Sequence, residues 1–286
     1  MSEIVYILLP VHNRKEVTRR FTGCLAKQTY HNYHLLLIDD GSTDGTAAMV
    51  RAQIPSLTVI TGTGNWWWGG SLHQGYLWLR KNAASPTDIV LIINDDNEFD
   101  PDFLEKAVEA LRSRPKTFLL SECFGRKTGQ WIEAGIHVDW KQFTFEHASA
   151  GKPMNCMSTR GLFFRVEAFS IVGGFHPLLL PHYLSDYEFT YRAGQKGITL
   201  ATDPSVRVRL DESTTGYNRV EDASLLGRLK KVFSRRSAIN PLTLSMFVAL
   251  ACPWQWKLMC WLRITWLSLS NGWKLLTGKT GGGSSR

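Results

Sequence analysis

Cysteine is scarce in this sequence and follows no spacing that carries chemistry. The 286 residues include five cysteines, an odd number, and none of them forms a C-x-x-C pair or another ligand spacing. A disulfide framework and a cysteine-bound metal are therefore disfavoured, and we expect reduced thiols in a cytosolic setting. Met1 leads directly into a strand-like segment, so we expect no secretory signal either.

Acidic residues are absent from the C-terminal part of the chain. Residues 223–286 contain ten Lys and Arg and no Asp or Glu, whereas residues 1–222 hold 23 basic and 25 acidic residues. The formal net charge of +8 is thus a property of the tail. This asymmetry argues against a protein that coats nucleic acid, and it favours one basic surface with an anionic partner.

The tail also lacks an apolar run that is long enough to cross a bilayer, because Pro253 interrupts it after residues 242–252. Lys and Arg cluster in residues 225–236, and residues 242–269 are rich in Leu, Met, Phe and Trp. We therefore expect residues 223–280 to form amphipathic helices that attach peripherally, as a monotopic element, to the cytoplasmic face of a membrane. An anionic leaflet would add about 1 kcal/mol per basic residue. Three alternatives remain open: packing against the rest of the chain, a homodimer interface, and a two-helix hairpin through the membrane.

Strand-like and helix-like segments alternate in the first part of the chain. Apolar runs predict buried strands, and the helices are predicted from capping residues and spacing. The predicted strands are 4–9, 35–38, 57–60 and 89–93, and the predicted helices are 16–26, 42–52, 72–82 and 103–113, with a loop over 62–70. This order predicts an α/β fold with a mostly parallel, doubly wound sheet of the nucleotide-binding type.

The rest of the chain is less periodic. We expect residues 1–115 to bind a nucleotide-containing ligand and residues 116–222 to form the second substrate's pocket in the same domain. The helical tail follows, and residues 281–286 are expected to be a flexible end.

Polar clusters follow three of the predicted strands. Residues 94–97 read Asn-Asp-Asp-Asn directly after a buried strand, and residues 10–13 and 39–42 follow two others. In open α/β sheets ligands lie at the carboxyl ends of strands, and adjacent buried carboxylates need a cationic partner. Asp95 and Asp96 therefore predict a Mg²⁺ or Mn²⁺ site that is shared with a diphosphate. A plain strand-end turn, or for Asp39 and Asp40 a turn with a helix cap, is the competing interpretation.

The order and spacing of these motifs resemble family 2 glycosyltransferases, which have the GT-A fold. The motifs in this sequence are Pro10-Val11-His12-Asn13, Asp39-Asp40-Gly41-Ser42-Thr43-Asp44, Gly64-Asn65 with Gly69-Gly70 and Gly75, Asn94-Asp95-Asp96-Asn97, Gly173-Gly174-Phe175, and Ser185-Asp186-Tyr187-Glu188-Phe189 to Arg192. The resemblance covers about residues 3–210 and is rhamnosyltransferase-like. It implies an inverting, metal-dependent enzyme that uses a nucleotide-sugar such as a UDP- or dTDP-sugar.

The resemblance also implies roles for individual residues. Asp40 would contact the nucleotide base, Asp96 would be the main metal ligand, and Asp95 would lie beside it near the sugar or ribose. Asp186 would deprotonate an acceptor hydroxyl, although an N-cap of a helix beginning there is the alternative. The remaining residues expected at the donor are Pro10, His12, Asn13, Asn65, Gly69 and Gly70.

The expected acceptor contacts come from several segments. Trp67 and Trp68 would stack on a sugar, and Arg160 would line the junction between donor and acceptor. His182 would assist the acceptor, and Glu188 would compensate for Ser185, which stands where relatives have an acidic residue before the base. The competing interpretations are core packing for the tryptophans, a structural role for His182 and a surface position for Arg160.

Two departures from the family pattern limit the function. Val208-Arg209 stands where many relatives have a late histidine, so Arg209 is a candidate contact of the diphosphate. No Gln-x-x-Arg-Trp signature is present, which argues against a processive synthase. We therefore expect transfer of a single sugar to a lipid-linked or envelope glycan acceptor.

Two other functions compete with this one. A nucleotidyltransferase would need a basic, glycine-rich loop after the first strand, and residues 11–14 lack those glycines. A non-catalytic membrane scaffold that binds nucleotide-sugars is the other.

Overall fold

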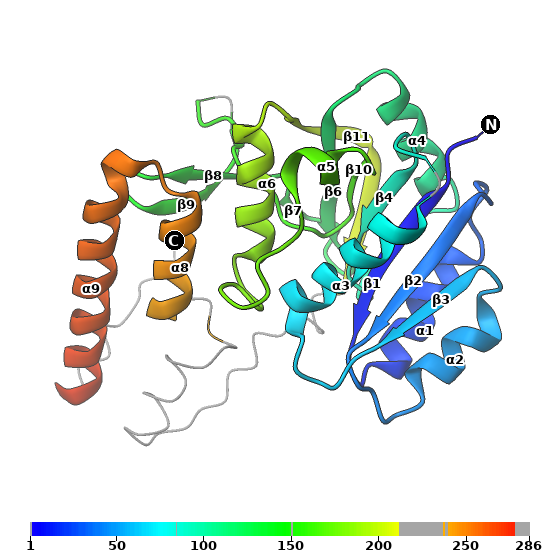
Figure 1. Ribbon diagram of the computed structural model, residues 1–286, viewed down its shortest axis with the longest axis horizontal. Helices are drawn as coiled ribbons and strands as arrows, with labels where there is room; N and C mark the ends of the chain where they lie inside the picture. The colour runs from blue at the N-terminus through cyan, green and yellow to red at the C-terminus, as the bar shows by residue number, and fades with distance from the viewer. Residues whose placement is uncertain (1, 84, 150, 212–236, 238–239, 278–286) are drawn as a thin grey trace.

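The computed structural model describes residues 2–83, 85–149, 151–211, 237 and 240–277, with side chains described up to residue 269 (Figure 1). The described elements follow one another as β1 (Val5–Val11), α1 (Lys15–Leu25), β2 (Tyr33–Asp39), α2 (Thr46–Gln53), β3 (Leu57–Thr61), α3 (Trp67–Asn82), β4 (Ile89–Ile92), β5 (Asn97–Glu98), α4 (Phe103–Arg112), β6 (Thr117–Gly125), β7 (Trp131–Glu133), β8 (Ile136–Asp139), β9 (Thr144–His147), β10 (Leu162–Arg165), α5 (Ala168–Val172), α6 (Ser185–Gln195), β11 (Thr199–Leu210), α8 (Pro241–Ala251) and α9 (Trp254–Thr277).

One large sheet connects the two halves of the chain. Its strand order is β3-β2-β1-β4-β10-β6-β11-β5, with β7 paired to β6, and β8 and β9 form a separate small sheet. The strands β1 to β4 are parallel neighbours, whereas β10 runs antiparallel between β4 and β6. Helices cover both faces (Figure 1). The predicted α/β fold with a mostly parallel sheet is confirmed.

The alternating side chains of the strands divide between two apolar layers. In β1, Ile7 and Leu9 face the layer that α1, α2 and α4 cover, while Tyr6 and Leu8 face the layer under α3, α5 and α6. A strand buried on both faces reads as a continuous apolar run, and this explains why the β1 and β4 segments were predictable. Burial of both faces fixes the register, since a shift by one residue would exchange the two layers.

Helix α3 begins earlier than its sequence pattern predicts. The predicted loop over 62–70 ends at Trp67, and Gly69 and Gly70 are in the first turns of the helix. Glycine weakens a helix, so local propensity favours a later start. Tertiary packing overrides it: a Cβ on Gly69 would lie 2.5 Å from the Leu180 carbonyl oxygen. Only a glycine lets the loop before α6 approach this closely.

Two helices, α8 and α9, form in the tail, and both are apolar on more than one face. Their inner faces join the small β8–β9 sheet and the outer side of α6 in a third apolar cluster, which includes Trp140, Tyr191 and Phe247. Packing against the rest of the chain, one of the alternatives, thus holds for these inner faces. They lie at the end of the molecule opposite β2 and β3 (Figure 1). No described helix is long and apolar enough to span a bilayer. The basic cluster 225–236 and residues 281–286 lie outside the described residues.

The polar strand ends lie together at one edge of the sheet. Because β1, β2 and β4 are parallel and in register, the residues that follow Val11, Asp39 and Ile92 share that edge.

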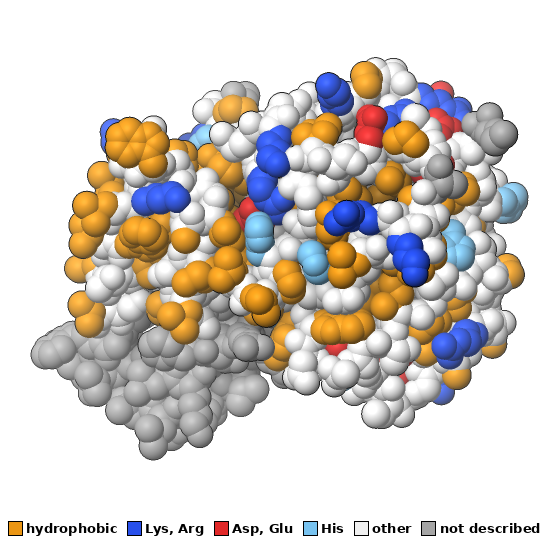
Figure 2. All heavy atoms as spheres, viewed as in Figure 1, with side chains coloured by type: hydrophobic (Ala, Val, Ile, Leu, Met, Phe, Trp, Pro, Cys, Tyr) orange, Lys and Arg blue, Asp and Glu red, His pale blue; other side chains and the backbone are white. Residues whose placement is uncertain are grey.

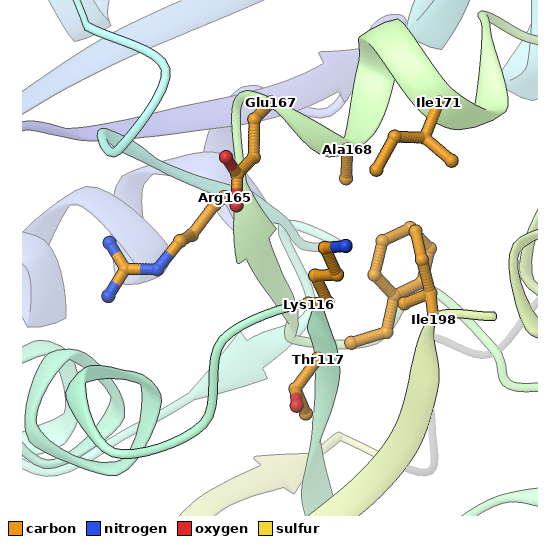
Figure 3. A pocket seen from close by; sticks show the side chains of 8 residues that line it. Lys116, Thr117, Arg165, Glu167, Ala168, Ile171 and Ile198 are labelled. Carbon is orange, nitrogen blue, oxygen red and sulfur yellow. The ribbon is translucent and has the colours of Figure 1, made fainter.

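Two hollows lie near the opposite edge. The smaller, about 10 Å³, is lined by residues such as Thr117, Arg165 and Ile198 (Figure 3). The larger, about 530 Å³, lies between α3 and α5. Neither is lined by the predicted site residues.

Candidate active site

Asp95 is held by a cation that the sequence analysis did not name. Nε of Arg14 lies 2.8 and 2.9 Å from the two carboxylate oxygens of Asp95, and the Thr18 hydroxyl donates a third hydrogen bond at 2.9 Å. Asp95 is buried, so this pairing offsets the cost of removing its charge from water. Its carboxylate is thus bound by Arg14 and by Thr18 of α1, and a contact to the donor sugar or ribose stays a prediction. The position of Arg14, just after the first polar cluster, was the only signal for this role.

Asp96 is bound less completely than its neighbour. Nη2 of Arg14 is 3.7 Å from one carboxylate oxygen, and the other oxygen, Oδ1, is buried and accepts no hydrogen bond from any residue within the described ranges. Burial and the adjacent Asp95 raise the pKa of Asp96, while Arg14 and Arg160 oppose that increase. The side-chain oxygens of Asn94 and Asn97 are likewise buried and without a partner in the described part of the chain.

These oxygens fit a hard divalent cation. A buried carboxylate oxygen without a partner, in a segment that also has two such amide oxygens, is the donor chemistry that Mg²⁺ and Mn²⁺ prefer. The described residues contain no group of three or more His, Cys, Asp and Glu that could hold a metal by themselves. An ion at Asp96 would therefore need further oxygen ligands from a substrate or from water.

Asp40 organises the loop in front of α3. Its carboxylate accepts hydrogen bonds from the backbone N–H groups of Gly64, Trp66 and Trp67, at 2.8, 2.8 and 3.1 Å. Asp40 is buried, and a carboxylate has about four lone-pair positions, so these bonds occupy most of its capacity. The structure accounts for Asp40 as the anchor of this loop, and its contact with a nucleotide base stays a prediction.

The loop after β1 is tied to the same region. Nδ1 of His12 lies 2.6 Å from the Asp40 carbonyl oxygen, and the Asn13 side chain accepts a hydrogen bond from the Thr43 N–H at 2.8 Å. His12 and Asn13 are exposed, Pro10 is buried in β1, and Asn65 is exposed in the next loop. The structure thus brings together the first two polar clusters and the 62–67 loop, while Gly69 and Gly70 pack against protein atoms instead of facing outward.

Asp186 lies in the first turn of α6. The N-cap residue is Leu184, so Asp186 is not the cap, and the helix-capping alternative is wrong. Leu184 has a φ of +63°, a left-handed conformation that is costly for a branched residue. Oδ1 of Asp186 accepts the Tyr187 N–H at 3.0 Å. Burial raises the pKa of Asp186 to about 6.

Arg160 lies within electrostatic reach of the predicted base, Asp186, and of the predicted metal ligand, Asp96. Its positive charge lowers the pKa of Asp96 and of Asp186, and those two side chains and Glu133 raise its own pKa. Arg160 makes no hydrogen bond or close ion pair with the residues that the structure describes. Its guanidinium donors are therefore available to an anion between the two carboxylates.

Glu133 is a carboxylate that the sequence analysis missed. It ends β7, is 7% exposed, and accepts a hydrogen bond from the Ser158 hydroxyl. Its negative charge acts on Asp186 and Arg160. No spacing in the sequence indicates this proximity, because β7 is a three-residue strand more than fifty positions from Asp186.

The three consecutive tryptophans have different surroundings. Trp66 and Trp68 pack against the apolar layer under α3, and Nε1 of Trp68 donates to the Thr159 hydroxyl at 3.2 Å. Trp67 has a φ of +58°, and its ring centroid is 5.5 Å from that of His182. The pair formed by Trp67 and His182 is therefore the better candidate for a sugar contact, and core packing accounts for much of Trp68.

Two residues that were expected to contact a substrate form ion pairs within the protein. Glu188 is 2% exposed and forms a two-pronged ion pair with Arg192, whose guanidinium also donates to backbone carbonyls after α5. It therefore fixes α5 to α6, in contrast to the acceptor role that the sequence predicted. Arg209 pairs with Asp100 through two hydrogen bonds of 2.6 and 3.2 Å, and its contact with a diphosphate stays a prediction.

Comparison with known families assigns the chain to a family. The family model "Glycosyl transferase family 2" matches residues 6–170, which is more than half of the chain, and the model "Glycosyl transferase family group 2" matches residues 89–277. The chain belongs to glycosyl transferase family 2. It is a glycosyltransferase, a transferase of the EC 2.4 class.

Curated relatives of this glycosyltransferase are distant. An N-acetylglucosaminyl-diphospho-decaprenol L-rhamnosyltransferase of Mycobacterium tuberculosis is 22% identical over 234 residues, covering 73% of this chain and 76% of the relative. An uncharacterized glycosyltransferase of Haemophilus influenzae is 25% identical over 201 residues, covering 66% of this chain and 62% of the relative.

Solved structures share the fold of this glycosyltransferase. The mannosyltransferase PcManGT from Pyrobaculum calidifontis, in complex with GDP-Man and Mn²⁺, is similar with a TM-score of 0.58 and 17% identity, covering 99% of this chain and 76% of that one. S. aureus TarS in complex with UDP is similar with a TM-score of 0.60 and 15% identity, covering 95% and 74%. These likenesses establish the GT-A fold.

Proposed function

We propose that this glycosyltransferase moves one sugar, with inversion, from a nucleotide-sugar to a lipid-linked or envelope glycan acceptor. The observation that carries the proposal is the pairing of Asp186 with Asp96 around Arg160. One carboxylate has a raised pKa suited to a base, and the other has an orphaned oxygen suited to a cation. A guanidinium without a close partner among the described residues lies within reach of both.

Asp186 acts as the general base in this proposal. Its carboxylate takes the proton from an acceptor hydroxyl as that oxygen attacks the anomeric carbon, and the bond from that carbon to the diphosphate breaks on the opposite side. A base with a pKa near 6 is deprotonated at neutral pH and still binds a proton well enough to assist attack. The Tyr187 N–H orients the carboxylate, and Arg160 attracts the negative charge that gathers between donor and acceptor.

The donor is assigned to residues 1–115 and the acceptor to residues 116–222. Mg²⁺ or Mn²⁺ bound at Asp96 would neutralise the departing diphosphate, and Asp95 is held beside it by Arg14. The loops carrying Pro10, His12 and Asn13, together with the loop that Asp40 anchors, form the proposed nucleotide side. We expect a UDP- or dTDP-sugar.

A lipid-linked acceptor is favoured by the name of one relative and by the exposed apolar face of α9. The Mycobacterium tuberculosis relative is named for a diphospho-decaprenol substrate. In this chain the outer face of α9 exposes large apolar side chains, with Trp254 at 84%, Leu258 at 69% and Trp266 at 68% (Figure 2). Because such a face is unfavourable in water, we propose that residues 223–280 attach the enzyme peripherally to the cytoplasmic face of a membrane, where an anionic leaflet attracts the tail's Lys and Arg.

A donor screen tests this proposal directly. The purified chain and its Asp186→Asn variant are incubated with UDP-, dTDP- and GDP-sugars, with Mn²⁺ or Mg²⁺, and nucleotide release and thermal stabilisation are measured. We expect one donor class to stabilise both proteins and to be turned over only by the wild type. Turnover by Asp186→Asn at the wild-type rate would reject the base, and stabilisation by no nucleotide-sugar would reject the donor class.

A further inference from the structure

The active-site cluster contains one more carboxylate than the proposed mechanism uses. Glu133 is buried at the end of β7, where its backbone pairs with Cys123 of β6. Within the described ranges it forms no close ion pair, and its hydrogen-bond partner is the neutral Ser158 hydroxyl. A buried carboxylate without a direct cationic partner costs free energy, so its position needs a reason beyond packing.

A short segment joins Glu133 to the helix of the proposed base. Ser158 binds Glu133, and one residue earlier the Met157 N–H donates to the Thr190 hydroxyl oxygen at 2.8 Å. The same hydroxyl lies 2.9 Å from the carbonyl oxygen of Asp186. Residues 157–160 are therefore fixed to β7 on one side and to the first turns of α6 on the other. This arrangement places the backbone of Arg160 two residues from the Glu133 contact and next to the helix that carries Asp186.

We infer that Glu133 is a positioning residue for the proposed base, a second carboxylate beside Arg160 that strengthens Asp186 as a proton acceptor. A negative charge near Asp186 makes its proton harder to remove, and the positive charge of Arg160 works in the opposite direction. The inference rests on the proposed role of Asp186. It adds that two charges outside α6 set the strength of that base.

The surroundings of Asp186 leave these two charges dominant. Cys156 and Tyr187 also lie near it, but burial raises the pKa of both, so they are neutral at working pH. Helices α8 and α5, which pack against α6, contain no titratable side chain. The other elements packed against α6 carry His73, Arg80 and Lys81 on α3 and Asp203, Arg207 and Arg209 on β11, and none of these is among the main influences on the pKa of Asp186. After burial itself and the Tyr187 N–H, Glu133 is the largest influence on the pKa of Asp186, and Arg160 is the charge that opposes it.

The pH dependence of turnover tests this inference. Glu133→Gln removes the charge but keeps an oxygen that can accept the Ser158 hydroxyl. We expect the acid limb of kcat to move to lower pH by roughly half a unit or more, which is about a threefold gain relative to wild type on that limb. Glu133→Asp should restore the wild-type limb. Ser158→Ala, which leaves the charge in place, should keep the limb near its wild-type position.

Arg160→Gln provides the opposite test and remains informative if the Glu133 variants fold poorly. Its acid limb should move to higher pH, whatever happens to KM. An equal loss of activity at every pH in Glu133→Gln, or an unmoved limb in either charge variant, overturns the inference. If Asp186→Asn is inactive and the limbs do not move, Glu133 alone is excluded; if Asp186→Asn keeps wild-type turnover, the proposed base itself fails.

Discussion

At the scale of single residues, the site combines groups that are unfavourable in isolation. Leu184 adopts a left-handed backbone conformation immediately before α6, and Asp186 is a carboxylate whose ionised form is disfavoured by burial. Strain and desolvation of this kind persist only where the surrounding structure enforces them. The hydrogen bonds from Thr190 and the close approach at Gly69 supply that enforcement.

Asp186→Asn should abolish turnover without loss of the fold. General bases contribute roughly a hundred- to ten-thousand-fold to rate, so kcat should fall by about that factor while donor affinity is maintained. In the wild type the carboxylate becomes protonated as the pH falls through about 6, so turnover should decrease about tenfold per pH unit below that value. Steady-state kinetics between pH 4.5 and 8 measure both effects, and an acid limb near pH 4 would contradict the raised pKa.

The same shift has a consequence for stability. The pKa of Asp186 is higher in the folded protein than in the unfolded chain, where it is near 3.8, so the folded state binds more protons between about pH 4 and 6. The group's contribution therefore favours folding at low pH and is lost as the pH rises through 6. Asp186→Asn should raise the melting temperature at pH 7 relative to wild type, and this difference should shrink near pH 4. Calorimetry at the two pH values checks the sign.

Asp96→Asn should abolish turnover and the effect of Mn²⁺ on ligand binding. A cation that depends on Asp96 loses the one unpartnered carboxylate oxygen found among the described residues, so Mn²⁺ should no longer enhance binding of the nucleoside diphosphate in calorimetry. In the wild type, EDTA should stop turnover and added Mn²⁺ or Mg²⁺ should restore it. Full turnover in EDTA would show that Asp96 has another function.

At the scale of elements, the strand ends were predictable from the sequence and the contacts between them were not. Continuous apolar runs identify β1, β2 and β4, and parallel pairing brings their polar ends to one edge. Local patterns do not reveal side-chain partners that are distant along the chain. Arg14 and Asp95 are 81 positions apart, and Glu133 reaches Asp186 from a short strand of the less periodic half. Glu188 has the composition of a site residue, yet an i,i+4 pair with Arg192 holds it inward.

Two glycines in helices should respond oppositely to the same substitution. Gly69→Ala places a Cβ 2.5 Å from the Leu180 carbonyl oxygen and should displace the loop before Asp186, lowering both kcat and the melting temperature. Gly23→Ala in α1 meets no atom within 4 Å and should stabilise the protein by about 0.5–1 kcal/mol, because alanine is the better helix former. Chemical denaturation and turnover assays distinguish the two, and equal effects would contradict the packing explanation.

At the scale of the whole molecule, most of the exposed large apolar side chains of the described residues lie on α8 and α9. Hydrophobic side chains gather over α8 and α9 on the face in view (Figure 2). The inner residues of α9, Trp256, Cys260 and Ile264, repeat at helical spacing and join the third apolar cluster. The outer residues repeat between them and face away from the protein. One helix thus has two apolar faces, and only one of them packs against other residues in the described part of the chain.

The exposed face of α9 should bind lipid. Wild-type protein should co-sediment with vesicles that contain phosphatidylglycerol, more weakly with pure phosphatidylcholine and less at high salt, because apolar insertion and charge attraction act together. Replacing Leu258 and Leu262 with Glu should abolish sedimentation. Leu77→Glu, at an exposed site on α3, is the matched control and should leave it unchanged. Equal sedimentation of all three proteins would reject the membrane proposal. Dimerisation of the wild type without lipid would favour the homodimer alternative.

The packing of α8 on α6 has a practical consequence for anyone who shortens this chain. The ring of Phe247 stacks on Trp140 with centroids 5.3 Å apart, and Trp140 contacts Tyr191 of α6 at the same distance. Removing the tail to obtain a protein that is easier to handle would remove Phe247 and expose one side of the helix that carries the proposed base. Loss of activity after such a truncation would then reflect a less ordered α6, which carries Asp186, as well as the loss of the proposed membrane attachment. Substitutions confined to the outer residues of α9 separate the two effects.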